Sequence, residues 1–388
     1  VYLAVTLFLL CSTVTSFQQR FSEHFVEFLL NNEERNEFAL KSFKEYKHAG
    51  TFGGRVDRDD EEDSEKPISR HDPVIFVHGN QESALNFSAT ATGWNNQIEY
   101  FLSKGYSMAE LHGLTHGQRN VTVALSNRFT CEVFRGVRRH IESVLHYTQS
   151  PKVDIISHSM GVTIARAAII GGTLNFSDGV CHLGHSLASK VDTFLGIAGA
   201  NYGVCYCAIH YLMGVEACSH DAFATGVCRV NNENDEEMAA YAPNHCAAEN
   251  VSCDNNYASI LRQINERNEP CGDFTVSTWS KQDEILGFTN MAWGKKTSHI
   301  PNSDLTIEYG DLTHSEIKDL TSRHQHELVN MHAINVEVPH ISHRNHNRRY
   351  NTSHRPAHRH IFVEHLKPIP ASTMTVKPPK VAEDNEED

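Results

Sequence analysis

The chain has 388 residues and a formal net charge of −14, and this acidic balance excludes two classes of partner. Nucleic-acid binding needs a basic surface, and anionic membranes attract basic segments, so we expect neither. The length exceeds one average domain, and a single α/β domain with an insertion fits it as well as two domains do.

The N-terminal segment predicts a secretory signal peptide. Residues 1–16 are apolar and end in small residues, and Val14 and Ser16 suit cleavage after Ser16. This run is too short to span a bilayer, and no later apolar run is longer, so we expect no transmembrane segment. We therefore expect a secreted, extracellular protein that begins at Phe17. The alternative is a buried N-terminal helix.

Two further features fit an extracellular compartment. Sequons of the N-x-S/T type predict N-glycosylation at Asn86, Asn120, Asn175, Asn250 and Asn351. Of the ten cysteines, Cys11 lies in the predicted signal peptide. An oxidising compartment favours disulfides over zinc for the remaining nine cysteines. Because nine is an odd number, one thiol is left free or shared with another chain.

The predicted elements, in chain order, begin with a helix over 22–45 that has Ser22 as its N-cap. An acidic run at 57–65 predicts a solvated linker. Beyond it, apolar runs predict strands and periodic patterns predict helices. The strands are expected at 73–79, 153–156, 191–198, 274–279 and 305–309, and the helices at 94–104 and 131–148.

Strands that alternate with helices predict an α/β fold, a mostly parallel sheet with helices on both faces. We divide the mature chain into an N-terminal helix with the acidic linker, 17–72, a principal domain, 73–332, and a tail, 333–388. The tail is rich in His and Pro and predicts disorder because such a composition buries little apolar surface.

A cysteine-rich segment at 200–272 interrupts the alternation of strands and helices. Its cysteines are Cys205, Cys207, Cys218, Cys228, Cys246, Cys253 and Cys271. We predict an insertion that is held by disulfides over one end of the sheet. It is either a cap or lid over an active site or a surface excursion, and the sequence does not separate the two.

The strongest chemical signal is the run from Val153 to Gly161, Val-Asp-Ile-Ile-Ser-His-Ser-Met-Gly. It predicts a buried strand, a sharp turn that carries Ser159, and a helix, which is the setting of a nucleophile elbow. Such a turn needs small residues two positions before and after the nucleophile. Gly161 satisfies this, and Ser157 occupies the position where the pattern has glycine.

The partners of Ser159 are expected in the chain order Ser, Asp, His. Asp283 follows the strand 274–279 and His314 follows the strand 305–309, so both lie at carboxyl ends of strands, where open α/β sheets bind ligands. Glu284 and Asp311 are competing acids. The competing bases are His299, His324 and His326.

An oxyanion hole is expected from two backbone N–H groups. His78-Gly79-Asn80 follows the first core strand, and its turn would bring the N–H of Asn80 close to that of Met160. We expect His78 to brace this turn by hydrogen bonding rather than to act as a base. Gly79 and Gly161 complete the supporting turn.

The combination of motifs resembles the class 2 lipases, secreted α/β-hydrolase triacylglycerol lipases of bacteria and nematodes. The resemblance extends from about Pro73 to about Met331 and includes the turn after 73–79, the Ser159 elbow, Gly196–Asn201, Ser280–Gly287, Lys296–Pro301 and the His314 loop. It implies a triad of Ser159, Asp283 and His314, with oxyanion N–H groups at Asn80 and Met160. Members of this family also lack the first elbow glycine, which makes Ser157 tolerable.

We therefore expect a secreted serine ester hydrolase that forms an acyl-enzyme, without a metal or an organic cofactor. Its partner would be a lipid or another ester, with transient contact with lipid interfaces. Two alternatives stay open. One is a short-chain carboxylesterase or thioesterase on the same scaffold, and the other is a catalytically silent lipid-binding protein.

Overall fold

The computed structural model describes residues 20–31, 50–55, 69–88, 91–117, 125–207, 215–224, 258–287, 290–292, 295–335 and 359–366. The predicted signal peptide, the acidic run 57–65 and the sequons at Asn120, Asn250 and Asn351 lie outside these residues. Asn86 and Asn175 lie inside them, and both side chains are exposed.

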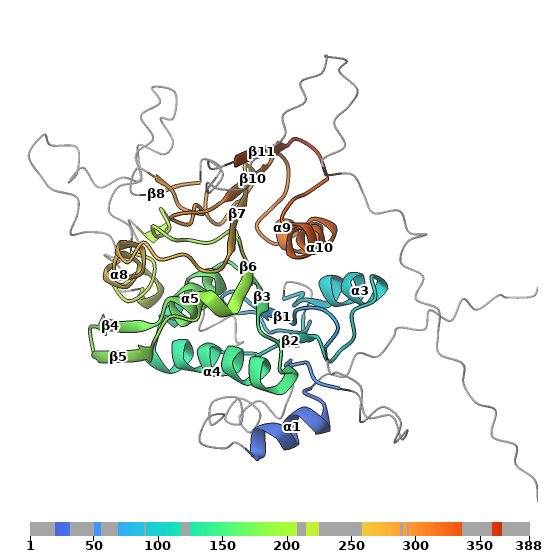
Figure 1. Ribbon diagram of the computed structural model, residues 1–388. Helices are drawn as coiled ribbons and strands as arrows, with labels where there is room; N and C mark the ends of the chain where they lie inside the picture. The colour runs from blue at the N-terminus through green and yellow to red at the C-terminus, as the bar shows by residue number, and fades with distance from the viewer. Residues whose placement is uncertain are drawn as a thin grey trace, which may run out of the picture.

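A seven-stranded sheet forms the centre of the molecule (Figure 1). Its order is β11-β10-β7-β6-β3-β1-β2, and every neighbouring pair is parallel. The strands are β1 (Val74–Val77), β2 (Leu111–Gly113), β3 (Val153–His158), β6 (Val191–Ile197), β7 (Phe274–Ser280), β10 (Leu305–Tyr309) and β11 (Arg359–Val363). From β1 the chain first adds β2 on one side and then adds β3 and the later strands on the other side. Ligands bind at such a topological switch point in open α/β sheets.

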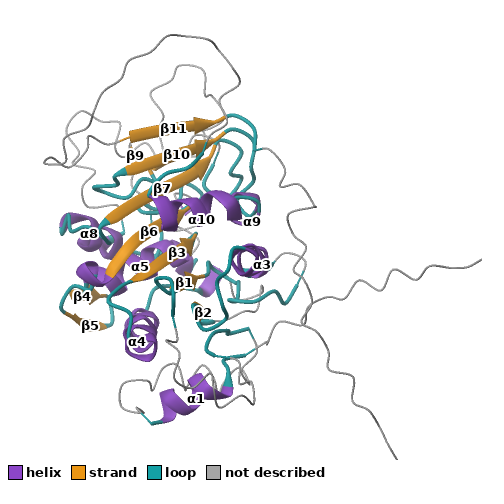
Figure 2. Ribbon diagram, turned by 45° about the vertical axis from the view of Figure 1, so that its right-hand side comes forward, coloured by secondary structure: helices purple, strands orange, loops and turns teal. Residues whose placement is uncertain are grey.

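Helices cover both faces of the sheet (Figure 2). One face carries α3 (Asn95–Ser103), α9 (Glu316–Asp319) and α10 (Ser322–Met331), and the other carries α4 (Cys131–Thr148), α5 (Met160–Ile170) and α8 (Ser259–Glu266). Two 3-10 turns, η3 (Ala188–Lys190) and η5 (Glu216–Cys218), complete the described helical elements. The parallel sheet with helices on both faces agrees with the alternating pattern, and the arrangement is that of the α/β-hydrolase fold that the resemblance implied.

The central strands form where continuous apolar runs predicted them. Every residue of β1, β3 and β7 is buried, because a parallel sheet covered on both faces offers no solvent-facing side. The described helices α3 and α4 also agree with the prediction. One short strand and two hairpins escaped it: β2, the hairpin of β4 (Gly172–Phe176) and β5 (Gly179–Gly184), and the hairpin of β8 (Met291–Ala292) and β9 (Lys295–Lys296).

The N-terminal helix α1 (Glu23–Leu30) packs on the principal domain rather than standing apart from it. Ser22 is its N-cap and accepts a hydrogen bond from the Phe25 N–H at 3.1 Å. Phe25 and Leu29 are buried, and the Phe25 ring lies 4.7 Å from the ring of Tyr147 in α4. The predicted continuation of this helix beyond residue 31 lies outside the described residues.

Part of the tail predicted as disordered is instead ordered. Residues 359–363 form β11, which pairs with β10 and extends the sheet by one edge strand. The prediction of disorder was made from the composition of the whole tail. Ile361-Phe-Val363 is a short run of β-favouring residues among His and Arg, and it changes that composition little. Pairing continues past the strand, where the Gly310 N–H donates to the Val363 carbonyl at 2.9 Å. The principal domain therefore does not end at residue 332.

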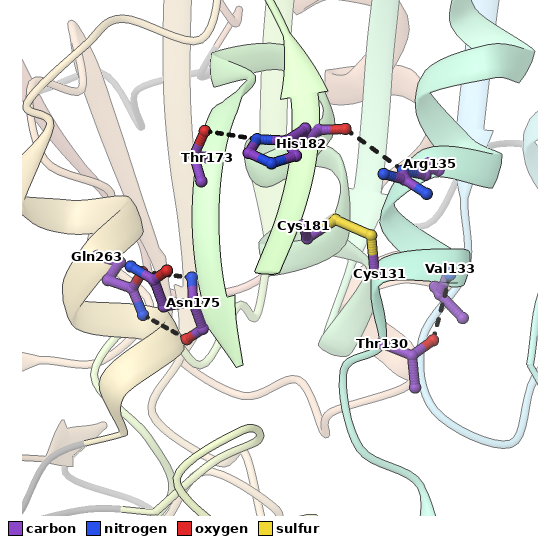
Figure 3. The surroundings of a disulfide bond; sticks show 9 residues. All are labelled: Thr130, Cys131, Val133, Arg135, Thr173, Asn175, Cys181, His182 and Gln263. Atoms are coloured by element: carbon purple, nitrogen blue, oxygen red, sulfur yellow. Dashed lines mark hydrogen bonds between the residues drawn. A yellow bond between two sulfur atoms is a disulfide. The ribbon is translucent and has the colours of Figure 1, made fainter. Parts of the chain in front are cut away.

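Disulfides join surface elements to this core. Cys131 at the start of α4 is bonded to Cys181 in β5, which ties the β4–β5 hairpin to α4 (Figure 3). Cys207 is bonded to Cys218 inside the cysteine-rich segment, whereas Cys271 is a buried free thiol. Much of 200–272 lies outside the described residues, so its role as a cap stays a prediction. Within the described part, no helix is long and apolar enough to cross a membrane.

Candidate active site

Ser159 lies on a strained turn between β3 and α5. Its backbone angles are φ 54° and ψ −125°, a conformation that L-residues seldom adopt and that is typical of functional turns. The Ser159 N–H donates to the Ile197 carbonyl at 2.9 Å, which ties the turn to the end of β6. The strand therefore ends and the helix begins at one residue, and the hydroxyl lies at the carboxyl edge of the sheet.

The close approach of β1 and α5 explains why this turn needs small residues. A Cβ atom at Gly161 would lie 2.5 Å from the Val77 carbonyl oxygen and closer still to that of His78. A Cβ atom at Gly79 would lie 2.9 Å from the Cβ of Ser159. Both glycines therefore let backbone segments pass closer than any side chain permits.

Ser157 fits at the position where the elbow pattern has glycine. It is fully buried, and its Oγ donates to the Leu195 carbonyl at 3.0 Å, so its polar group is satisfied. On the neighbouring strand β6 the residue in register is Gly196. The serine side chain is therefore small enough for this position, and its hydroxyl has a hydrogen-bond acceptor on β6.

The three residues of the predicted triad form one chain of hydrogen bonds. Ser159 Oγ lies 3.0 Å from His314 Nε2, and His314 Nδ1 lies 2.8 Å from Asp283 Oδ2. Asp283 is fully buried and His314 is 7 % exposed. Because Asp283 accepts from Nδ1, the other ring nitrogen is free to accept the proton of Ser159.

Further contacts hold the acid and the base in place. The second oxygen of Asp283 accepts the N–H groups of Ile285 at 3.0 Å and Leu286 at 2.8 Å. Glu284, a competing acid in the sequence, instead accepts the backbone N–H of His314 at 3.0 Å. Asp311, the other competitor, is paired with His365 at 2.9 Å.

The competing histidines lie elsewhere. His324 Nδ1 contacts the hydroxyl of Tyr309 at 2.8 Å, and the ring of His326 packs on aromatic side chains that include Phe101. His299 follows β9, and its N–H donates to the Lys296 carbonyl at 3.1 Å. Of the histidines that the sequence offered after Asp283, His314 is the one that the fold brings to Ser159.

The predicted oxyanion groups lie on the two turns that flank Ser159. Met160 is the first residue of α5, and the N–H of a first helical residue has no acceptor within the helix. Asn80 follows Gly79 in the turn after β1, and its side-chain Oδ1 accepts from Asn127 Nδ2 at 2.6 Å.

His78 connects the turn after β1 to the chain beyond β2. Its Nδ1 donates to the Gly79 carbonyl at 2.8 Å, and its Nε2 accepts the His116 N–H at 3.0 Å. The rings of His78 and His116 stack with centroids 3.9 Å apart. These contacts link His78 to both segments, and its bracing role stays a prediction.

Sequence reasoning missed a buried charged group behind the site. Glu82 accepts the Gly79 N–H at 2.9 Å and lies 2.9 Å from Lys318 Nζ and 3.3 Å from His158 Nδ1. No motif distinguishes Glu82 or Lys318 in the sequence. His158 directly precedes Ser159 within the elbow. The elbow pattern accepts any residue at this position, so it predicted no role for His158.

Comparison with known proteins places the chain among lipases. The model of the class 2 lipase family matches residues 71–327, which include Ser159, Asp283 and His314. The comparison with curated proteins found no match.

Several solved structures are similar to this chain. A lipase of Bacillus licheniformis in its mature form is 15% identical with a TM-score of 0.40, over 68% of this chain and 94% of that one. Lipase B of Aspergillus fumigatus is 13% identical with a TM-score of 0.38, over 69% and 56%. A monoacylglycerol lipase of Paleococcus ferrophilus is 12% identical with a TM-score of 0.36, over 68% and 97%.

The family match spans more than half of the chain and contains the whole hydrogen-bonded group around Ser159. We conclude that the chain belongs to the class 2 lipase family and is a carboxylic ester hydrolase.

Proposed function

We propose that this protein is a secreted lipase that hydrolyses acylglycerol esters through an acyl-enzyme on Ser159. The observation that carries the proposal is the continuous hydrogen-bonded chain from Ser159 Oγ through His314 to Asp283. A serine hydroxyl is a weak nucleophile until a base takes its proton, and this chain supplies the base and its orienting acid.

In the first half of the reaction, Ser159 Oγ attacks the ester carbonyl while its proton moves to His314 Nε2 across the 3.0 Å contact. The imidazolium so formed keeps its Nδ1–H on Asp283, whose buried carboxylate stabilises the positive charge. Collapse of the tetrahedral intermediate transfers the proton to the departing alcohol and leaves an acyl-enzyme.

The backbone N–H groups of Asn80 and Met160 are the donors that stabilise the negative charge on the carbonyl oxygen in the tetrahedral intermediate. Removing one such donor costs about 10²- to 10³-fold in kcat in serine hydrolases. Donors that are oriented before the substrate arrives are supported by the Gly79–Glu82 hydrogen bond beside Asn80 and by the place of Met160 at the start of α5. In the second half, His314 activates water, which releases the fatty acid and restores Ser159.

Lipid as the substrate class is supported by the family. Ile285, two residues beyond Asp283, adds an apolar side chain that is 53% exposed. Secretion is supported by the disulfides and by the predicted signal peptide, because such bonds persist in oxidising compartments.

The proposal is tested with p-nitrophenyl esters of increasing acyl length and with triacylglycerol emulsions, on the wild type and on Ser159→Ala. We expect Ser159→Ala to lose at least about 10³-fold in kcat and to keep its fold by circular dichroism. A rate that rises above the solubility limit of the substrate supports a lipase. A rate confined to short soluble esters favours the carboxylesterase alternative, and unchanged turnover by Ser159→Ala contradicts the assignment.

A further inference from the structure

Glu82 is a buried carboxylate that contacts three segments of the proposed active site. Its Oε2 accepts the N–H of Gly79, which directly precedes Asn80, at 2.9 Å and lies 3.3 Å from His158 Nδ1. Its Oε1 lies 2.9 Å from Lys318 Nζ. These three residues belong to the turn after β1, the end of β3 and the helix α9 that follows the His314 loop.

Lys318 neutralises this carboxylate inside the protein. Its side chain is fully buried, and its Nζ also donates to Thr92 Oγ1 at 3.0 Å and lies 3.4 Å from Asp319 Oδ1. Burial alone would raise the pKa of Glu82, but the charge of Lys318 and the ring of His158 outweigh it and hold that pKa well below its usual range. Glu82 is therefore ionised at neutral pH.

His158 connects this pair to the proposed base. The residue directly precedes Ser159, and its Nε2 donates to the backbone carbonyl of His314 at 3.0 Å. The two imidazole rings lie with their centroids 4.8 Å apart. The backbone of His314 is therefore held on one side by Glu284, at its N–H, and on the other by His158, at its carbonyl.

We propose that Glu82 and Lys318 are positioning residues that hold the oxyanion turn and the His314 loop in register with Ser159. Glu82 holds the turn through the hydrogen bond from Gly79 and lies against the His158 ring, and that ring donates to the carbonyl of His314. Lys318 anchors the same carboxylate to α9, four residues beyond His314. The inference rests on the proposed function, because the geometry it protects is that of the Ser159 reaction.

A positioning role of Glu82 and Lys318 can be distinguished by experiment from a contribution to stability alone, because the two partners of a buried ion pair can be replaced together. Replacing a buried pair by uncharged groups of similar volume is often neutral for stability, whereas removing one partner leaves an uncompensated charge and is strongly destabilising. A neutral pair at 82 and 318 should therefore fold yet lose the hydrogen bonds that align the site. A misplacement of about 1 Å can cost about 10²-fold in rate.

The test is the double variant Glu82→Met/Lys318→Met, which removes the acceptor of the Gly79 N–H, assayed for kcat and KM on a soluble p-nitrophenyl ester and for thermal unfolding. We expect kcat to fall by about 30- to 100-fold with KM within about threefold and with the unfolding midpoint close to that of the wild type. Labelling of Ser159 by a fluorophosphonate should slow by a similar factor, because the same geometry activates the hydroxyl.

The matched control is Asp154→Asn, which alters a buried carboxyl at the opposite end of β3. Asp154 accepts the Thr193 N–H at 2.9 Å, far along the strand from His158. We expect this control to keep kcat within about twofold. If the double variant does not fold, His158→Phe replaces it, since that change leaves the ion pair and removes the hydrogen bond to His314; we expect kcat to fall about tenfold.

Wild-type kcat in the folded double variant, or in His158→Phe, overturns the inference and leaves the proposed function intact. Wild-type esterase activity that survives Ser159→Ala overturns the proposed function and the inference together. A loss of kcat in the double variant that Asp154→Asn matches also contradicts a specific role of Glu82, because any buried carboxyl would then have the same effect.

Discussion

Ser159 Oγ and His314 Nε2 lie 3.0 Å apart, although 155 positions separate the two residues in the chain. The fold brings them together because β3 and β10 end at the same edge of one parallel sheet. The adjacent strand β7 ends there too and delivers Asp283. Serine, acid and base thus come from three strand ends, and their alignment depends on the register of the sheet.

Asp283→Asn should reduce kcat by about 10³- to 10⁴-fold while KM stays nearly constant. The amide keeps an oxygen for the N–H groups of Ile285 and Leu286, but its NH₂ group favours the wrong tautomer of His314. Steady-state kinetics on a soluble ester measure this change. Asp311→Asn is the matched control, because Asp311 pairs with His365 at 2.9 Å, and it should stay within about twofold of the wild type.

Gly161→Ala should destabilise the protein by about 3 kcal/mol or more and abolish most activity. The new Cβ would overlap the Val77 and His78 carbonyl oxygens, which are backbone atoms and cannot move without shifting β1. Urea denaturation measures the loss. An unfolding free energy equal to that of the wild type would show that β1 and α5 are farther apart than described.

Ser157→Gly should have a small effect, although it changes the same turn. The substitution removes one buried hydrogen bond to the Leu195 carbonyl and a small side chain, which costs about 1 kcal/mol. The activity should stay within about threefold, because the backbone of Ser159 is unchanged. A loss of activity as large as that of Gly161→Ala would mean that the Ser157 hydroxyl has a role in the reaction.

Asn127→Ala should lower kcat by about tenfold with little change in KM. Asn127 donates at 2.6 Å to the side chain of Asn80, a residue of the proposed oxyanion hole. Asn127 lies four residues before Cys131, whose disulfide fixes the start of α4. Asn330→Ala serves as the control, since Asn330 bonds Tyr106 and is expected to leave kcat unchanged.

The stability of the protein should fall as the pH drops below about 6.5. Burial lowers the pKa of His112 to about 4 and that of His140 to about 3. Below pH 6.5 these histidines are protonated in the unfolded chain but stay neutral in the folded chain. Each histidine therefore lowers the free energy of unfolding by about 1.4 kcal/mol per pH unit, until the pH reaches its folded pKa. Asp154 acts in the opposite direction, because burial raises its pKa well above the usual value.

His140→Phe tests this pH dependence. Neither ring nitrogen of His140 has a hydrogen-bond partner among the described residues, and its ring stacks on Phe21 with centroids 5.7 Å apart. We expect the variant to be more stable than the wild type at about pH 5 and to differ less at about pH 8, as followed by thermal unfolding. An equal shift at both values would show that the pKa of His140 does not differ between the folded and the unfolded chain.

The sequence predicted the central part of the fold because buried parallel strands are continuous apolar runs. It also selected Ser159, Asp283 and His314, since the order of the motifs and their places after strands restrict the choice strongly. The elements it missed are short or polar. β2 has three residues, and the alternation in β5 belongs to a hairpin held by Cys131–Cys181 rather than to the sheet.

The supporting residues of the site could not be predicted. Glu82, His158 and Lys318 meet only after folding, and each alone resembles an ordinary polar residue of a turn, a strand end or a helix. β11 was missed for a related reason, because its neighbours in the tail dominate the composition. Tertiary contacts, rather than local patterns, decide both cases.

The most direct test of the account is covalent labelling with a fluorophosphonate, followed by peptide mapping in a mass spectrometer. The wild type should carry one label, on Ser159, and His314→Ala should label at least about a hundredfold more slowly, because the base at 3.0 Å is gone. A label on another serine, or an equal rate of labelling in His314→Ala, would contradict the central claim that His314 activates Ser159.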